Sequence, residues 1–302
     1  MRQKLFNLDP QDYEHPFDRK ALNALRSTPG LEPLVRKFNQ YGIDKILKVN
    51  YTGSNIKVNE RNFPEVHAAL NEVVEIISPP VVPDLYIRWD FSINAFTAGV
   101  EKPIIVLNSG CLDLLDHEEL LYLIGHEVGH IKSQHVLYHQ MAQIIPLLGS
   151  IVGDVTLGFG RLISTGLQIA LLNWQRMSEF TADRAGLLAC QNVTAASNAL
   201  VKMAGLPQKY LNSFNVEEFI AQAKEFEDYD FDTLDKVAKV VSIMLADHPW
   251  IVMRAAEFYK WIESGEYDQI LNKCNSENGI CKQCGFSLGG TEIFCPRCGN
   301  KI

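Results

Sequence analysis

The sequence predicts an α+β fold that is predominantly helical, with one small mixed β-sheet and a separate cysteine-containing segment near residue 300. Three observations support this prediction. All strand candidates lie before residue 111, helical patterns fill the chain from there to about residue 271, and four of the seven cysteines form two CxxC pairs after residue 280. Because 47% of the 302 residues are hydrophobic, the chain can build a sizeable core.

Charge and the polarity of the first residues restrict the function classes. A formal net charge of −8 argues against broad nucleic-acid binding, which needs a concentrated basic surface, so we expect no nucleic-acid partner. The first twenty residues are too polar for the core of a signal peptide, so we expect a cytoplasmic protein. In that reducing compartment, paired cysteines favour metal binding over disulfides.

The first part of the chain is predicted to begin with helices and continue as a sheet. Residues 1–45 show helical spacing with a break at 27–30, which predicts an N-terminal segment of two short helices. Residues 46–59, with TGSN in their middle, predict a β-hairpin. Residues 62–80 predict a helix that ends at prolines. The stretches LYIRWD, SINAFTAG and IIVLNSG then predict three further strands.

The chain after Asn108 is predicted to be almost wholly helical. A helix over residues 116–141 begins with acidic residues, which suit the positive end of the helix dipole. Residues 144–172 are apolar but are divided by charges, glycines and a proline, so they predict a buried or mobile helical hairpin, or alternatively one that contacts a membrane surface. We therefore expect three units: the N-terminal segment 1–45, a main domain 46–272 and a cysteine segment 273–302.

The motif HEVGH lies within the predicted helix 116–141. In an HExxH pattern, His126 and His130 fall on one helix face and can bind Zn²⁺, while Glu127 is left to deprotonate a metal-bound water. A polar helix face is the alternative for so short a pattern. The surrounding LLYLIGHEVGHI is apolar, however, and buried polar side chains need partners, which favours a metal site.

A catalytic zinc needs a third protein ligand. The spacing of the metzincins would place that histidine six residues after His130, where the chain has Val136. His135 and His139 have other spacings and are read as satisfied surface or core histidines. In NWQRMSEFTADRAGLLAC, Glu179 and Asp183 lie one turn apart on an apolar helix. Glu179 is therefore the expected third ligand, and Asp183 is expected to accept a hydrogen bond from the outer N–H of a ligand histidine. The alternative is that both carboxylates lie on a solvated helix face.

These motifs together resemble the gluzincin metallopeptidases of the HtpX and CaaX-prenyl-protease family. HEVGH, SEFTADRAG, NAFTAG at 94–99 and HPWIVMR at 248–254 occur in the family's order, and the resemblance covers about residues 60–265. It implies a zincin-like catalytic domain. The membrane members of that family carry long spanning helices, which here are absent or reduced to residues 144–172, so a membrane-protein or prenylated substrate is not implied.

The resemblance also assigns roles to residues. It implies zinc ligands His126, His130 and Glu179, the general base Glu127, and an Asp183 that accepts from a ligand histidine and pairs with Arg254. It further implies an oxyanion-stabilising or gating role for His248, although a His-Pro pair is also an ordinary helix cap or turn. The last implied group is the edge strand against which an extended peptide lies: Asn94, Ala95 and Phe96.

The two CxxC pairs near the C-terminus predict a zinc ribbon. Ten residues separate the pairs, which suits a structural zinc site with four cysteine ligands, and local disulfides or a redox motif are the alternatives. The four expected ligands are Cys281, Cys284, Cys295 and Cys298. Together with the catalytic ion, this site predicts two Zn²⁺ per chain. The ribbon is not basic, so its expected partner is a protein.

The sequence thus predicts a zinc-dependent endopeptidase that acts on proteins or peptides. Its mechanism would use a metal-activated water and no covalent intermediate. The alternative is a non-proteolytic zinc-binding protein that acts through its ribbon.

Overall fold

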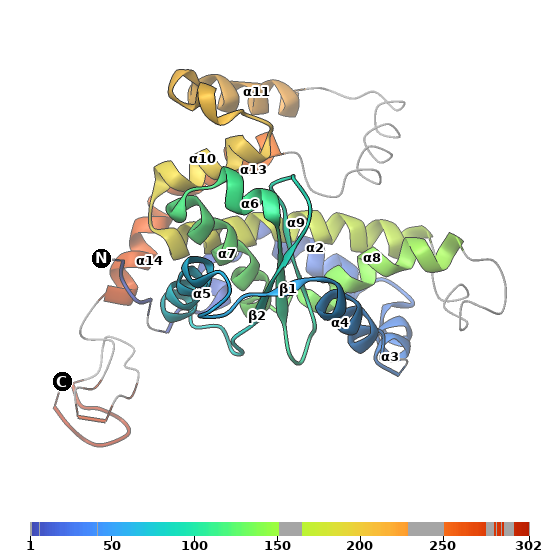
Figure 1. Ribbon diagram of the computed structural model, residues 1–302. Coiled ribbons are helices and arrows are strands. Elements are labelled where there is room, and N and C mark those ends of the chain that lie inside the picture. Colours follow the sequence, from blue (N-terminus) through green and yellow to red (C-terminus); the bar gives the residue numbers. More distant parts are fainter. Residues whose placement is uncertain are drawn as a thin grey trace.

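A small mixed sheet and two long helices packed together form the centre of the molecule (Figure 1). The computed structural model describes residues 2–5, 7–40, 42–150, 165–228, 251–275, 281, 283, 284, 286 and 293–301. Its elements confirm a predominantly helical α+β fold with one small mixed sheet.

The sheet has four described strands in the order β1-β2-β4-β3. Strands β2 and β4 pair in parallel, whereas β1 pairs antiparallel with β2 and β3 pairs antiparallel with β4. β3 therefore forms one edge of the sheet. The strands are β1 Ile56–Lys57, β2 Asp84–Arg88, β3 Ala95–Ala98 and β4 Ile104–Asn108.

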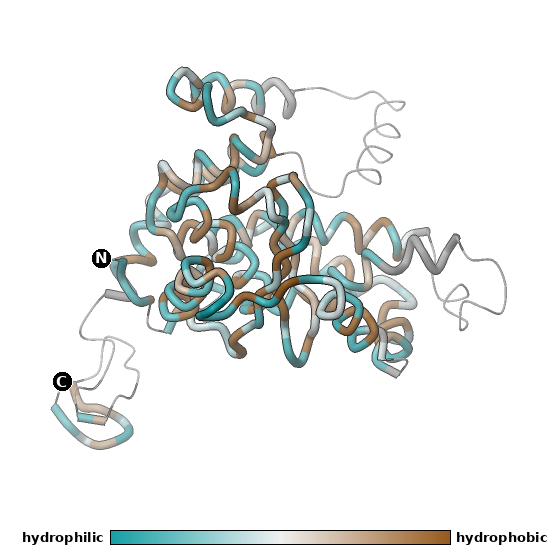
Figure 2. Tube along the Cα trace, viewed as in Figure 1, coloured by the Kyte–Doolittle hydropathy of each residue, from teal (hydrophilic) through white to brown (hydrophobic). Residues whose placement is uncertain are grey.

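The two faces of the sheet pack against different partners. Leu85 and Ile105 point into the main hydrophobic core, while Tyr86 and Val106 belong to a smaller cluster on the other face. This alternation follows from the two-residue period of a strand. Figure 2 shows the hydrophobic strands at the centre of the molecule.

The N-terminal part is helical, and it differs from the prediction in two respects. Two helices flank the predicted break at residues 27–30, but a further short helix, α1, precedes them, so residues 1–45 hold more than the two predicted helices. The predicted hairpin at 46–59 is mostly helix, and only Ile56–Lys57 pairs with β2. Tyr51 explains this second difference, because its ring packs 4.8 Å from that of Phe96 on the sheet, a tertiary contact that overrides strand propensity. The helices are α1 Pro10–Tyr13, α2 Pro16–Arg26, α3 Leu31–Gln40, α4 Ile43–Ser54 and α5 Pro64–Ile77.

The predicted helix over residues 116–141 is broken in two. α7 ends at Lys132, and Gln134 has a positive φ of 60°, which a continuous helix does not allow. The next described helices are α6 Ser109–Leu114, α7 His117–Lys132, α8 Val136–Ser150 and α9 Thr165–Cys190.

Helices α7 and α9 approach each other closely because small residues meet at their interface. A Cβ added at Gly125 would lie 2.3 Å from the Cβ of Ala189, and one added at Gly129 would lie 2.5 Å from the Cβ of Ala185. Both glycines flank the HEVGH histidines, so they let α9 reach the face of α7 that carries the motif.

Two hydrophobic cores stabilise the helices. The main core joins α5, α7, α9 and the later helices α10 and α13. A second core joins α2 and α3 to α8 and α9 around Trp174, so the N-terminal segment packs on the helix that carries Glu179. The remaining elements are α10 Val193–Met203, the 3₁₀ helix η3 Gln208–Ser213, α11 Val216–Asp228, α13 Ile251–Glu263 and α14 Glu266–Asn275.

Two sequence predictions concern residues outside the described part of the chain. His248 lies there, and so do residues 151–164 of the apolar stretch 144–172. Within the described part, no helix is both long and apolar enough to cross a membrane.

Candidate active site

Helices α7 and α9 bring His126, His130 and Glu179 together. The Nε2 atoms of the two histidines lie 3.2 Å apart. One oxygen of Glu179 lies 3.4 Å from Nε2 of His126, and the other lies 3.3 Å from Nε2 of His130. All three side chains are buried, so three residues from two separate helices converge on one point.

The chemistry of these donors fits a zinc ion. Bonds of about 2.0–2.1 Å to a tetrahedral zinc place neighbouring ligand atoms roughly 3.3–3.4 Å apart. The two Nε2 atoms are 3.2 Å apart, and each of them has a Glu179 oxygen at 3.3 or 3.4 Å. Two imidazoles and one carboxylate also leave a fourth position open, as in catalytic zinc sites.

Asp183 holds the outer nitrogen of His126. Its carboxylate lies 3.0 Å from Nδ1 of His126 and accepts hydrogen bonds from the Tyr122 hydroxyl at 2.7 Å and from Nε of Arg254 at 2.8 Å. Burial alone would raise the pKa of Asp183, but the Arg254 guanidinium and the hydrogen bonds from Arg254 and His126 hold it well below its usual range. The carboxylate is therefore charged and fixes the orientation of His126.

His130 has a different partner on its outer nitrogen. Its Nδ1 lies 3.0 Å from Nδ1 of His135, and Nε2 of His135 lies 3.3 Å from the carboxylate of Asp18 on α2. His139 forms a hydrogen bond with the Ser178 hydroxyl at 2.8 Å. Both non-motif histidines are therefore hydrogen-bonded, as predicted, and His135 in addition contacts one of the expected ligands.

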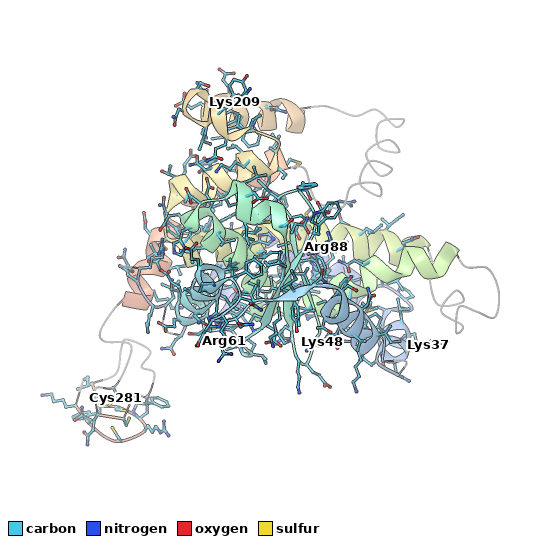
Figure 3. All side chains as sticks on the ribbon, viewed as in Figure 1. Lys37, Lys48, Arg61, Arg88, Lys209 and Cys281 are labelled. Carbon is cyan, nitrogen blue, oxygen red and sulfur yellow. The ribbon has the colours of Figure 1, made fainter. Side chains whose placement is uncertain are left out.

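Glu127 faces a cavity of about 240 Å³ beside the three expected ligands. The hydroxyl of Thr97 on β3 donates a hydrogen bond of 2.6 Å to Glu127 Oε2. The cavity lies between the edge strand and the two helices. Its lining includes Asn94, Ala95 and Phe96, the predicted substrate strand, as well as Arg88, which is labelled in Figure 3.

The edge strand beside this cavity pairs with another described strand on one side only. β3 pairs with β4 on its inner side, from Ala95 opposite Leu107 to Ala98 opposite Ile104. Its outer side pairs with no strand of the described chain.

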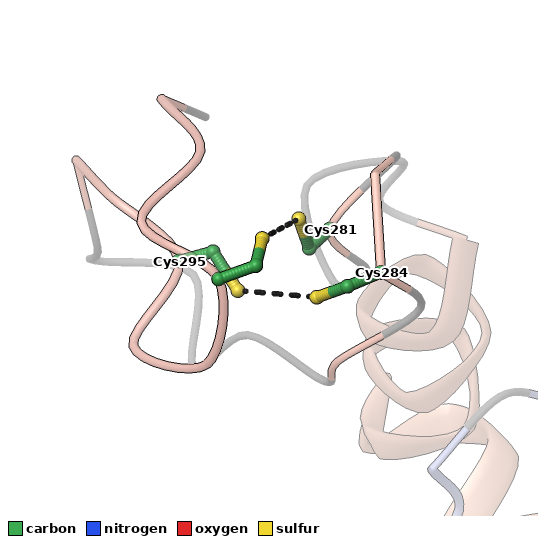
Figure 4. Close-up of side chains that lie close together, drawn as sticks. Cys281, Cys284 and Cys295 are labelled. Carbon is green, nitrogen blue, oxygen red and sulfur yellow. Dashed lines mark hydrogen bonds between the residues drawn. The ribbon is translucent and has the colours of Figure 1, made fainter.

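The four C-terminal cysteines also lie together. Figure 3 shows the labelled Cys281 away from the main group of helices. The Sγ atoms of Cys281 and Cys298 are 3.4 Å apart, and those of Cys284 and Cys295 are 3.6 Å apart (Figure 4). A disulfide would require about 2.05 Å, whereas zinc–sulfur bonds of about 2.3 Å separate sulfurs by roughly 3.8 Å. This geometry favours the metal interpretation over disulfides.

Sequence reasoning missed several residues around the expected ligands. Thr97 could have been found, because it lies two positions after Ala95 in a predicted strand and so shares its face. Tyr122 lies one turn before His126 on the same helix face. Asp18 gave no such signal, because its contact spans more than one hundred residues of sequence.

Peptidase family M48 matches residues 60–262. The plastoglobule-localized metallopeptidase 48 of Arabidopsis thaliana chloroplasts is 31% identical over 279 residues, which cover 91% of this chain and 79% of that protein. No solved structure matches significantly.

Bacterial proteases match over shorter regions. An HtpX protease homologue of Streptococcus gordonii is 27% identical over 49% of this chain and 60% of its own length. One of Dictyoglomus thermophilum is 39% identical over 37% of this chain and 36% of its own length. The family match spans more than half of the chain and contains both helices that supply the three converging side chains, so the protein belongs to the M48 family of zinc metallopeptidases.

Proposed function

We propose that His126, His130 and Glu179 hold the catalytic zinc and that Glu127 is the general base of a zinc-dependent endopeptidase. The single observation that carries this assignment is the convergence of the two histidine Nε2 atoms, 3.2 Å apart, on the Glu179 carboxylate, whose oxygens lie 3.4 Å from His126 and 3.3 Å from His130. Glu127 lines the same cavity as the three expected ligands, so the base and a bound ion would both be able to contact one substrate there.

The chain's own residues have distinct tasks in peptide hydrolysis. A zinc ion in this site would supply a water of lowered pKa and would polarise the scissile carbonyl. Glu127 takes a proton from the attacking water and passes it to the leaving amine. Thr97 holds the Glu127 carboxylate in place, while Asp183 and Arg254 hold His126.

The edge strand supplies the binding site for the substrate. The open side of β3 offers backbone N–H and C=O groups to an extended peptide, with Asn94, Ala95 and Phe96 nearest the cavity. Backbone pairing of this kind depends little on the side chains of the bound peptide. We therefore propose unfolded or extended protein segments as the substrate class.

The test compares the wild-type protein with Glu127→Gln on an unstructured protein such as casein. The variant should keep its zinc, because Glu127 is not a ligand, and should lose activity by about 10²–10⁴-fold, the usual contribution of a general base. Normal turnover by this variant would refute the assigned base. If the variant lost zinc as well as activity, the claim that Glu127 is not a zinc ligand would be refuted.

We further propose a zincin-like catalytic domain over residues 46–272 and a structural zinc in the ribbon 273–302. The cysteine geometry supports the second ion, so metal analysis should give two zinc per chain. Replacing Cys281 and Cys295 with serine should remove one of them. Because the expected ligands of the catalytic ion lie elsewhere, casein cleavage should survive.

Location and partners remain predictions from the sequence. A cytoplasmic location, a protein partner at the ribbon and membrane contact through residues 144–172 are the three expectations. The Arabidopsis relative is named for plastoglobules, so liposome flotation is a useful test of surface contact. The assignments to His248 also remain predictions, and His248→Ala kinetics would test them.

A further inference from the structure

The N-terminal helix α2 reaches the expected metal centre through a chain of three buried side chains. Asp18 on α2 contacts His135, and His135 contacts the expected ligand His130. Asp18 is 0% exposed and His135 is 3% exposed. The region that matches the M48 family begins at residue 60, so Asp18 lies outside it.

Once Nε2 of His130 binds zinc, the donor and the acceptor of each hydrogen bond between His130, His135 and Asp18 are determined. A neutral imidazole carries one proton, which then sits on Nδ1 of His130. The partner 3.0 Å away is Nδ1 of His135, which must accept that proton's hydrogen bond. The ring proton of His135 therefore sits on Nε2 of His135 and points to Asp18.

The Asp18 carboxylate accepts hydrogen bonds from two further side chains. The indole N–H of Trp174 donates to one of its oxygens at 2.9 Å, and the Thr181 hydroxyl donates to the other at 2.6 Å. Burial alone would raise the pKa of Asp18, but its hydrogen bonds to His135, Thr181 and Trp174 lower it. Both Trp174 and Thr181 lie on α9, the helix that also carries Glu179.

We propose that Asp18 and His135 are positioning residues for the catalytic zinc, which fix the ring and tautomer of His130 as Asp183 does for His126. The inference rests on the proposed function of His130. It makes the segment before the family-matched region part of the metal centre.

The test measures metal affinity in the full-length chain, with cobalt as a spectroscopic substitute for zinc. Thiolate-to-cobalt charge transfer reports the cysteine site separately and serves as an internal control. His135→Phe keeps an aromatic ring beside Trp174 but cannot accept, so cobalt and zinc should bind the histidine site about 10–100-fold more weakly. His135→Gln, with an amide oxygen, should recover part of that loss, and Asp18→Asn should show a smaller loss than His135→Phe.

Glu257→Gln is the matched control. Glu257 accepts from His15, so it also ties the N-terminal segment to the body through a buried histidine, but it does not contact the chain from Asp18 to His130. Its metal affinity should equal that of the wild type. If the wild type binds cobalt at the histidine site and His135→Phe binds it with the same affinity, this inference is wrong but the proposed function stands. If the wild type binds no cobalt at that site, the proposed function itself is wrong.

A measurement on the wild type keeps the test decisive if a variant does not fold. In the zinc-loaded protein with ¹⁵N-labelled histidines, the Nδ1 proton of His130 should appear far downfield and should couple to two ring nitrogens, its own and that of His135. Coupling to one nitrogen only would show that the bond is absent and would contradict the proposal.

Discussion

The hydroxyl of Thr97 donates a 2.6 Å hydrogen bond to Oε2 of Glu127, which joins the edge strand β3 to the helix that carries HEVGH. Ala95 and Thr97 share the buried face of this strand, while Phe96 packs on the opposite side against Tyr51. One strand therefore both holds the proposed base and forms the sheet edge at which we propose that the substrate binds.

The Thr97–Glu127 bond predicts a specific loss in Thr97→Val. Valine keeps the shape of threonine but cannot donate, and a hydrogen bond to a charged group contributes about 1.5–3 kcal/mol, so kcat should fall roughly 10–100-fold. Thr97→Ser retains the hydroxyl and should remain close to the wild type. Casein cleavage with zinc content held equal measures the effect, and equal rates for both variants would exclude a role for the hydroxyl.

Arg254 predicts a large effect on stability. Arg254→Met would leave the Asp183 carboxylate buried without its cationic partner, which costs about 3–5 kcal/mol of unfolding free energy. The double variant Arg254→Met/Asp183→Leu should recover much of this stability but not the zinc affinity, because His126 would still lack its acceptor. Denaturant titration and metal titration separate the two effects; full recovery of both would contradict the positioning role of Asp183.

The pair His15–Glu257 predicts an acid dependence of stability. The hydrogen bond from His15, aided by Lys260 and opposed by burial, lowers the pKa of Glu257 from 4.5 to about 2. A folded-state pKa below the unfolded value stabilises the protein above pH 4.5, and that contribution is lost as the pH falls from 4.5 towards 2. The stability difference between wild type and Glu257→Gln should shrink over this window, whereas a constant difference would argue against the pair.

Much of the site was predictable from the sequence because its residues are local to two motifs. His126 and His130 lie one turn apart on a helix, and Glu179 and Asp183 repeat that spacing on another. The structure brings these four side chains together. Strands β2, β3 and β4 were also predictable, because each is a short, largely apolar run between turn residues.

The parts that the sequence did not predict depend on tertiary contacts. Residues 46–54 have strand-like composition, yet Tyr51 on α4 packs against Phe96 and Lys48 donates to the carbonyl of Lys102, so the helix is stabilised from outside. The contact from Asp18 to His135 likewise has no local signal. A spacing rule cannot find a partner that only folding brings near.

Crystals of the zinc-loaded protein, with anomalous scattering recorded at the zinc edge, test the central claim most directly. We predict one peak about 2.0–2.2 Å from Nε2 of His126, Nε2 of His130 and a carboxylate oxygen of Glu179, and a second peak among the four cysteines as an internal reference. A peak at the cysteines with none between α7 and α9 would contradict the proposed catalytic centre.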